Sequence, residues 1–104
     1  MQPYLFPYIG YFQLIKYVDI FILLDDVSFI NRGWTNRNFI IVNKKKHMFT
    51  FSLKNKSQNI LIKDLELFDK KKISKKFLKT LSINYSKTKS FSIMYPLIKN
   101  ILFN

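Results

Sequence analysis

Apolar residues recur at helical intervals in three stretches, and this period predicts amphipathic helices. A short helix is expected over residues 11–18, with a stripe formed by Phe12, Leu14, Ile15 and Val18. A longer helix is expected over residues 70–85, after Asp69, because a carboxylate at the N-cap accepts hydrogen bonds from the free amides of the first turn. Its apolar positions are Ile73, Phe77, Leu78, Leu81 and Tyr85, and the side expected to face water carries Lys71, Lys72, Lys75, Lys76 and Lys79.

A last helix is expected to follow Ser90 and to reach the end of the chain. Pro96 should kink or restart it, because proline has no N–H for the helical ladder. Its apolar positions are Phe91, Met94, Leu97, Ile98, Ile101 and Leu102. We expect Leu97, Ile101 and Leu102 to be exposed in this chain, so that the stripe packs against a partner or a missing C-terminal half.

Strand signals lie between these helices. Residues 20–24 form a continuous apolar run of strand length, typical of a strand covered on both faces. Residues 39–42 and 48–53 flank a polar segment, and they predict a hairpin whose turn is residues 43–47. The buried side of its second strand is expected to carry Phe49, Phe51 and Leu53. A further strand is expected over residues 61–67.

Together these elements predict an α/β fold. It opens with a β-loop-α-β unit, in which an extended loop over residues 2–9 leads into the first helix and then the apolar strand, and continues with the hairpin and the C-terminal helices. A chain of 104 residues has room for one modest core. We therefore expect residues 1–104 to be a single domain, and an incomplete one, cut from a larger α/β domain.

Composition excludes several classes of protein. Without Cys there is no disulfide framework, no thiolate metal site and no Cys nucleophile, and one His cannot complete a hydrolase triad or a metal cluster. That residue, His47, lies in a Lys-rich turn and is interpreted as facing solvent. No transmembrane segment and no secretory signal is recognised, so a cytoplasmic location is predicted. The sequence identifies no cofactor and no metal site.

The net charge of +12 would ordinarily suggest a nucleic acid or an anionic membrane as partner. The Lys residues are spread in runs along the whole chain, however, and no nucleic-acid-binding motif accompanies them. We interpret most of them as solvated surface, and a nucleic-acid partner is not favoured.

The rare residue types lie close together, in contrast to the Lys. Both Arg, the single Trp and one of two Gly fall within residues 31–38, and the other Gly is Gly10. In a chain whose Lys, Asn, Ile and Phe content is typical of AT-rich codons, Arg, Trp and Gly are expected where their chemistry is needed. This contrast indicates a site around residues 2–37.

Three sequence blocks closely resemble the WbqC-like family in order and spacing: MQPYLFPYIGYFQLI at 1–15, DDV at 25–27 and RGWTNR at 32–37. The resemblance continues through residues 49–54, residues 57–59 and the helix ending near Tyr85. It corresponds to an N-terminal portion of the family's length, without the opening strand. It implies a cytoplasmic bacterial protein tied to O-antigen or other surface-polysaccharide gene clusters, and a transferase activity.

Arg32 and Arg37 are candidates to bind an anion, because a guanidinium makes bidentate bonds to phosphate or carboxylate that Lys cannot make. The alternative is a structural ion pair with Asp25 or Asp26. These two carboxylates follow the apolar run, where a general base or a divalent-metal ligand would lie, but they could also cap a turn.

The remaining candidates could bind substrate. Trp34 could stack on a sugar or a base, or it could close the core. Gln2, Tyr8 and Gly10 weakly resemble the loop-to-helix phosphate site of nucleotidyltransferases, although this chain has no His there. Gln2, Tyr8 and Asn36 are assigned to orient an acceptor. We expect the loops carrying these residues to lie on one rim of the sheet and to line one crevice.

The resulting hypothesis is a surface-polysaccharide biosynthesis protein that acts as a group transferase on an activated, phosphate-bearing small-molecule donor. In it Arg32 and Arg37 hold the anion, and Asp25 or Asp26 acts as base or metal ligand. The alternative is a non-catalytic accessory module that binds a partner or a polyanion through its basic surface.

Overall fold

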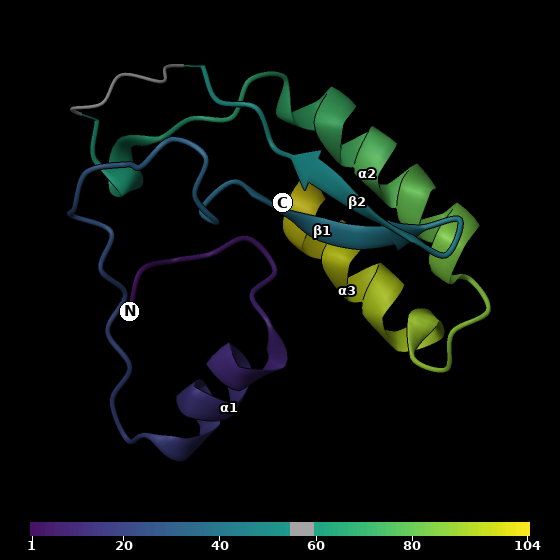
Figure 1. The fold of residues 1–104 in the computed structure, drawn as a ribbon, viewed down its shortest axis with the longest axis horizontal. Coiled ribbons are helices and arrows are strands. Elements are labelled where there is room, and N and C mark those ends of the chain that lie inside the picture. Colours follow the sequence, from purple (N-terminus) through teal and green to yellow (C-terminus); the bar gives the residue numbers. More distant parts are fainter. Residues whose placement is uncertain (55–59) are drawn as a thin grey trace. The chain divides into compact units, whose positions relative to one another are not determined.

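The computed structural model of the chain describes residues 1–54 and 60–104; residues 57–59, part of the resemblance above, therefore lie outside the described residues. Its elements are, in chain order, α1 (Ile9–Tyr17), β1 (Arg37–Val42), β2 (Lys45–Thr50), a 3-10 helix (Ile62–Asp64), α2 (Lys70–Tyr85) and α3 (Phe91–Phe103) (Figure 1). A helix, a two-stranded hairpin and two C-terminal helices confirm the mixed α/β class.

The chain divides into two compact units. The first unit comprises Met1–Asn38 and Thr50–Phe68, and the second unit comprises Phe39–Phe49 and Asp69–Asn104. Most of the hairpin and both long helices belong to the second unit, while the open end of the hairpin, at Arg37, Asn38 and Thr50, belongs to the first.

In the second unit, α2 begins and ends as predicted. The Asp69 carboxylate accepts a hydrogen bond from the Lys72 N–H at 3.4 Å and so caps the first turn. Phe77 and Leu78 are buried. The five Lys predicted to face water are all exposed.

The hairpin packs on α2 through specific contacts. The ring centroids of Phe49 and Phe77 lie 4.7 Å apart, and the Tyr85 hydroxyl accepts from the Ile41 N–H at 2.7 Å. Helix α3 packs against α2 in turn, so the second unit is a hairpin on a pair of helices (Figure 1).

The hairpin turn is shorter than predicted. Only Asn43 and Lys44 separate the strands, and both have positive φ, 51° and 63°. A two-residue turn with this backbone matches the twist of the flanking strands, whereas a longer polar turn was inferred from the Lys run. Continued to the open end, the tighter turn places Asn36 beside Phe51, whose N–H donates to the Asn36 carbonyl at 2.7 Å.

Helix α3 continues through Pro96, so of the two predicted effects of this proline, a kink or a restart, the restart does not occur. Leu97 and Ile101 are exposed as expected, but Leu102 is buried, because it lies on another face of the helix. The prediction that all three residues are exposed was wrong for Leu102.

The core of the first unit gathers around three buried side chains, Phe29, Leu53 and Ile62. Partly buried residues packed against them are Val27, Ile60, Leu65 and Leu67. The strand predicted over residues 61–67 does not form: a 3-10 helix occupies its middle, with single antiparallel bridges at Leu61 and Leu67. Burial of alternate side chains is thus achieved by short bridged segments rather than by a ladder.

The strand predicted over residues 20–24 does not form, because these residues have no regular secondary structure. Its pairing among the described residues is with Met1, whose amino group donates to the Ile22 carbonyl at 3.0 Å and whose carbonyl accepts from the Leu24 N–H at 2.8 Å. This is the hydrogen-bond pattern of a parallel pair, reduced to one residue. A β-strand forms only where a neighbouring segment is long enough to pair with it. The apolar composition of residues 20–24 was therefore not sufficient to predict a strand.

Helix α1 is present, but it buries a different residue from those predicted. Phe12 and Ile15 are exposed, and Tyr11 is the buried side chain. The Tyr11 ring packs near Tyr4 and Phe21, with centroids 5.8 and 5.4 Å away, and its hydroxyl donates to the Gln2 carbonyl at 2.9 Å. An aromatic residue outside the periodic stripe thus fixes α1 in the first unit.

Candidate functional site

The segment that holds both Arg forms a tight turn. Arg32 has the left-handed φ of 63°, and the Gly33 N–H donates to the Ile30 carbonyl at 3.3 Å. The Arg37 guanidinium closes this turn, because its Nε donates to the Gly33 carbonyl at 3.1 Å and its Nη2 donates to the Arg32 carbonyl. Arg37 therefore positions the backbone that carries Arg32.

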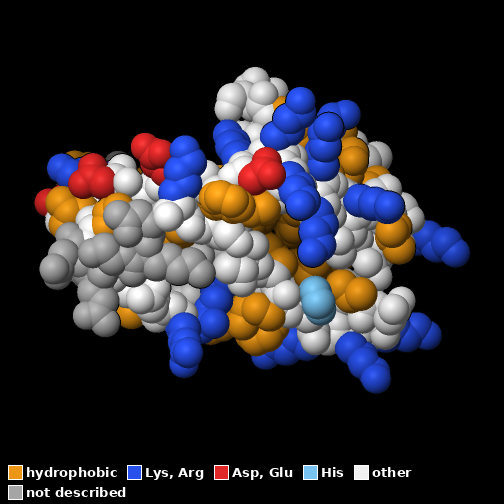
Figure 2. All heavy atoms as spheres, turned by 90° about the horizontal axis from the view of Figure 1, so that it is seen from above, with side chains coloured by type: hydrophobic (Ala, Val, Ile, Leu, Met, Phe, Trp, Pro, Cys, Tyr) orange, Lys and Arg blue, Asp and Glu red, His pale blue; other side chains and the backbone are white. Residues whose placement is uncertain are grey.

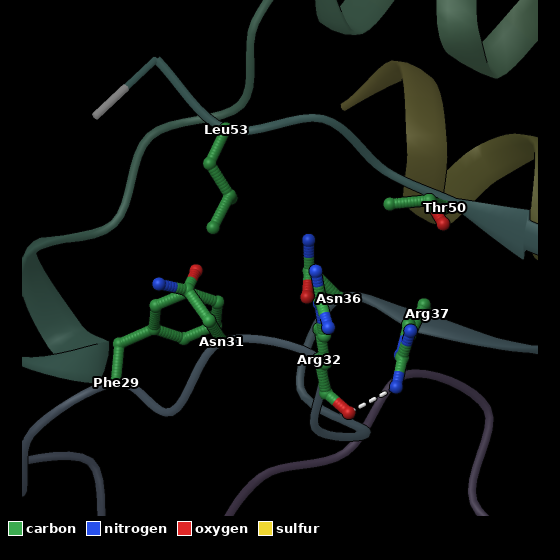
Figure 3. A pocket seen from close by; sticks show the side chains of 7 residues that line it. All are labelled: Phe29, Asn31, Arg32, Asn36, Arg37, Thr50 and Leu53. Atoms are coloured by element: carbon green, nitrogen blue, oxygen red, sulfur yellow. Dashed lines mark hydrogen bonds between the residues drawn. The ribbon is translucent and has the colours of Figure 1, made fainter. Parts of the chain in front are cut away.

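A cavity of about 400 Å³ opens beside this turn (Figure 3). Its walls combine two buried apolar side chains with polar ones: they are Phe29, Asn31, Arg32, Asn36, Arg37, Thr50 and Leu53. Figure 3 shows Arg32 and Asn36 standing between Phe29 and Leu53 on one side and Thr50 and Arg37 on the other. All of these residues belong to the first unit. We call this the arginine cavity.

The electrostatics of the arginine cavity favour an anion. Among residues 1–54 and 60–104, two Arg line it and no Asp or Glu does. No residue among 1–54 and 60–104 accepts a hydrogen bond from the Arg32 guanidinium, so its donors are available to a ligand. Beside apolar walls, a charged hydrogen bond is stronger than in bulk water.

The proposed structural ion pair between Arg32 or Arg37 and the two Asp is not formed. The ion pair found within the described parts of the chain joins other residues, Lys54 and Glu66, whose Nζ and Oε2 atoms lie 3.2 Å apart at the surface. Asp25 and Asp26 are exposed, and neither is among the residues that line the arginine cavity. Arg37 bonds to backbone carbonyls instead, a structural role the sequence did not indicate.

Asn36 is held in the wall of the arginine cavity by the neighbouring strand end. Its Nδ2 donates to the Phe51 carbonyl at 3.1 Å, beside the backbone bond between the same two residues. This leaves the amide oxygen of Asn36 as an acceptor near the two Arg.

Tyr8 and Trp34 lie elsewhere. With Tyr4, Pro7 and Asn38 they surround a second cavity of about 290 Å³, also within the first unit. Gly10 lies under the Tyr8 ring, where a Cβ would be 2.3 Å from Cε2 of Tyr8. The side chain of Gln2 lines neither cavity; its carbonyl accepts from Tyr11.

The predicted site residues thus form two groups, one around each cavity, and Asp25, Asp26 and Gln2 belong to neither. Several lining residues were not identified from the sequence: Asn31, Thr50, Phe29, Leu53, Tyr4, Pro7 and Asn38. Asn31 and Asn38 are the first and last residues of the segment 31–38 that holds both Arg and the Trp. This position could have identified them as candidate lining residues. Thr50 could be found only from the hairpin register, which the longer predicted turn misplaced.

The pKa of one side chain near the site, Tyr11, differs from its ordinary value. Burial raises the pKa of the Tyr11 hydroxyl above its ordinary value, and the neighbouring Tyr4 adds to the rise. Tyr11 is therefore neutral and available as a hydrogen-bond donor at physiological pH.

Residues 1–54 and 60–104 contain no cluster of three His, Cys, Asp or Glu side chains placed to hold a metal ion. No helix in the same residues has both the length and the apolar character needed to cross a membrane.

Comparison with known proteins adds a family. The model of the WbqC-like protein family matches residues 2–104, and this confirms the resemblance found in the sequence. The chain is 32% identical over 92 residues to "Uncharacterized protein Rv1507c" of Mycobacterium tuberculosis (strain ATCC 25618 / H37Rv). That alignment covers 88% of this chain and 40% of the relative, so the chain spans about two fifths of the relative's length. No solved structure matches the chain.

Proposed function

The chain belongs to the WbqC-like protein family, and from this premise we propose that it acts in bacterial surface-polysaccharide (O-antigen) biosynthesis, in the cytoplasm, as a group transferase that binds an activated, phosphate-bearing donor. Membership in the family suggests an association with polysaccharide biosynthesis. The chemical part of the proposal rests on the arginine cavity.

One observation carries that part: within the part of the chain that the structure describes, two Arg and three neutral polar side chains line a single cavity, and no carboxylate lines it. Arg32 supplies a planar fork of donors suited to two oxygens of one phosphate. Arg37 contributes charge while its hydrogen bonds keep the turn in place. Such a site holds the phosphate of an activated donor, and it gives Asp25 and Asp26 no role at this cavity.

The test is the binding of inorganic pyrophosphate, measured by calorimetry. Arg32→Lys keeps the charge and removes the fork, and we expect affinity to fall about tenfold or more, since hydrogen bonds to charged groups contribute about 1.5–3 kcal/mol. Arg37→Lys should also lower thermal stability, because it removes two bonds to the turn.

The matched control is Lys16→Gln/Lys63→Gln, which removes two exposed charges from the first unit away from the cavity. It should leave pyrophosphate affinity nearly unchanged. Full retention of affinity in Arg32→Lys would reduce Arg32 to surface charge and end the proposal.

A second candidate, a polyanion-binding accessory module, is favoured by the charge of the second unit. That unit carries twelve Lys against one Asp. Figure 2 shows many Lys and Arg side chains on the face in view, with hydrophobic side chains exposed between them. Salt separates the two functions, because contacts from several Lys to a polyanion weaken steeply with ionic strength, whereas two Arg on one phosphate weaken less.

A further inference from the structure

The second cavity has a different chemistry from the arginine cavity. Its lining, Tyr4, Pro7, Tyr8, Trp34 and Asn38, is aromatic and neutral, with two phenol hydroxyls and one amide. We call it the aromatic cavity. A site with flat apolar faces and a few groups that both donate and accept hydrogen bonds suits an uncharged, hydroxylated ring.

Hydrogen bonds fix the two walls of the aromatic cavity to each other. The Leu5 N–H donates to the Trp34 carbonyl at 3.0 Å. The Asn38 Nδ2 donates to the carbonyls of Leu5 and Phe6, at 3.0 and 2.9 Å. These bonds hold Phe6 at a φ of 46°, a conformation that a bulky residue rarely adopts. The backbone segments that carry the two walls are therefore held together by these bonds.

Gly10 sets the position of the Tyr8 ring. Because Gly10 has no Cβ, the ring can lie directly over the first turn of α1, where an added Cβ would stand 2.3 Å from Cε2 and 2.8 Å from Cζ of Tyr8. Tyr8 is also largely exposed, at 76%, so little besides this close approach defines its place. A glycine kept in a Gly-poor chain thus has a specific use at this cavity.

The two cavities share one segment. Along residues 34–38, Trp34 and Asn38 line the aromatic cavity, whereas Asn36 and Arg37 line the arginine cavity. The Arg37 guanidinium carbon lies 5.8 Å from the centre of the Trp34 ring, so the wall of one cavity contacts the wall of the other. A ligand with an anionic group joined to a ring can occupy both.

We infer that the aromatic cavity binds the sugar ring of a sugar phosphate whose phosphate lies on Arg32 and Arg37. This rests on the proposed function and names the class of its donor. The C–H face of a pyranose carries partial positive charge and packs on the negative faces of Trp34 and Tyr8. Its hydroxyl groups find partners in the phenol hydroxyls of Tyr4 and Tyr8.

Trp34 makes the inference directly measurable. It is the single Trp of the chain, so intrinsic fluorescence reports from the wall of the aromatic cavity. Binding of inorganic phosphate, glucose 1-phosphate and uridine 5′-monophosphate is titrated by this signal and checked by calorimetry. We expect glucose 1-phosphate to bind about tenfold more tightly than phosphate, the size of effect produced by stacking on one aromatic wall.

Tyr8→Ala removes one wall and should bring glucose 1-phosphate to the affinity of phosphate, without changing phosphate binding. Gly10→Ala should have the same effect, because its methyl group displaces the Tyr8 ring while alanine is well accepted in a helix. Tyr8→Phe keeps the ring and should retain most of the difference. Tyr17→Ala is the matched control: Tyr17 is an exposed Tyr at the end of α1 that does not line the cavity.

The outcomes separate the two proposals. If phosphate binds and depends on Arg32 but glucose 1-phosphate binds no more tightly, the sugar subsite is refuted and the anion site stands. Tighter binding of uridine 5′-monophosphate than of glucose 1-phosphate would assign the cavity to a base and also refute it. If none of the three ligands binds, the anion site fails and the sugar subsite fails with it.

Discussion

The two units of the chain carry different kinds of charge. The first unit has six basic residues against five acidic ones, and it contains both Arg, the single Trp and both Gly. The second unit has twelve Lys against one Asp and none of those three residue types. Arg appears where planar geometry is used, at the turn and the arginine cavity, and Lys covers exposed helix surface. The strong net charge therefore describes the second unit and says little about the candidate site.

The units also differ in regularity. The second unit is a hairpin on two helices, of which α2 is capped by the Asp69 side chain and α3 begins after Ser90 without a side-chain cap. The first unit joins a nine-residue helix, a 3-10 turn and isolated bridges, and its apolar residues 20–24 are mostly exposed. Both cavities lie in this unit, and they are lined partly by loop residues such as Arg32 and Trp34 and partly by the open end of the hairpin at Arg37, Asn38 and Thr50. Two of the positive-φ residues, Phe6 and Arg32, also lie in its irregular backbone. Loops held by a regular scaffold commonly carry binding residues.

The largest expected effect on stability comes from a substitution in the core of the second unit, and it tests whether binding belongs to the first unit alone. Phe77→Ala removes a ring that is 6% exposed and stacks on Phe49, and it should cost about 3–5 kcal/mol of the free energy of unfolding. If binding belongs to the first unit, pyrophosphate affinity should be unchanged wherever circular dichroism reports a folded chain.

The control is Ile83→Ala on the same helix, because Ile83 is 68% exposed. It should alter stability by less than about 0.5 kcal/mol. Should Phe77→Ala prevent folding, Phe77→Leu gives a milder loss and allows the same binding measurement. A fall in pyrophosphate affinity in a folded variant would place part of the site in the second unit.

A smaller effect tests where polyanions bind. Lys75→Gln/Lys76→Gln removes two exposed charges from α2. For a single-stranded DNA probe, the slope of log affinity against log salt should decrease in magnitude by about 1.4, at about 0.7 for each phosphate that Lys no longer neutralises. Lys16→Gln/Lys63→Gln in the first unit should change the slope less. Equal changes in both variants would show that net charge, rather than its location, governs polyanion binding.

The smallest effect concerns pH. Burial raises the pKa of Tyr11, so the folded state binds its phenol proton more tightly than the unfolded state does. This stabilisation is present below the unfolded value, about 10, and is lost as pH rises through the higher folded pKa. Denaturant midpoints should therefore fall more steeply above about pH 10 in the wild type than in Tyr11→Phe. Parallel curves would mean that Tyr11 titrates as an exposed Tyr does.

Local signals predicted the second unit well. Asp69 before an apolar stripe predicted α2 and its cap, because both depend on residues within a few turns of one another. The hairpin was recognised, but its turn was placed too long, because the Lys run is polar in either register and only backbone conformation at Asn43 and Lys44 selects the tighter turn.

The first unit was predicted less well, since its segments depend on distant partners. Residues 20–24 have strand composition, but they pair with a single residue, Met1. Arg32, Trp34, Asn36 and Arg37 were predicted to line one crevice as a local group, but the structure divides them between two cavities. Side chains of one short segment point in different directions. Which cavity each of them lines depends on residues that are distant in the sequence.

The sequence by itself determined the family, the helices of the second unit and the cluster of rare residues in residues 31–38, because these are properties of residue type and short-range spacing. The tertiary structure alone decided that Arg37 holds a turn, that Thr50 faces the two Arg, and that Asn38 fixes residues 5 and 6 against Trp34. Those relations join segments up to 33 residues apart. They arise from the packing and hydrogen bonding of the folded backbone, which residue spacing along the chain does not encode.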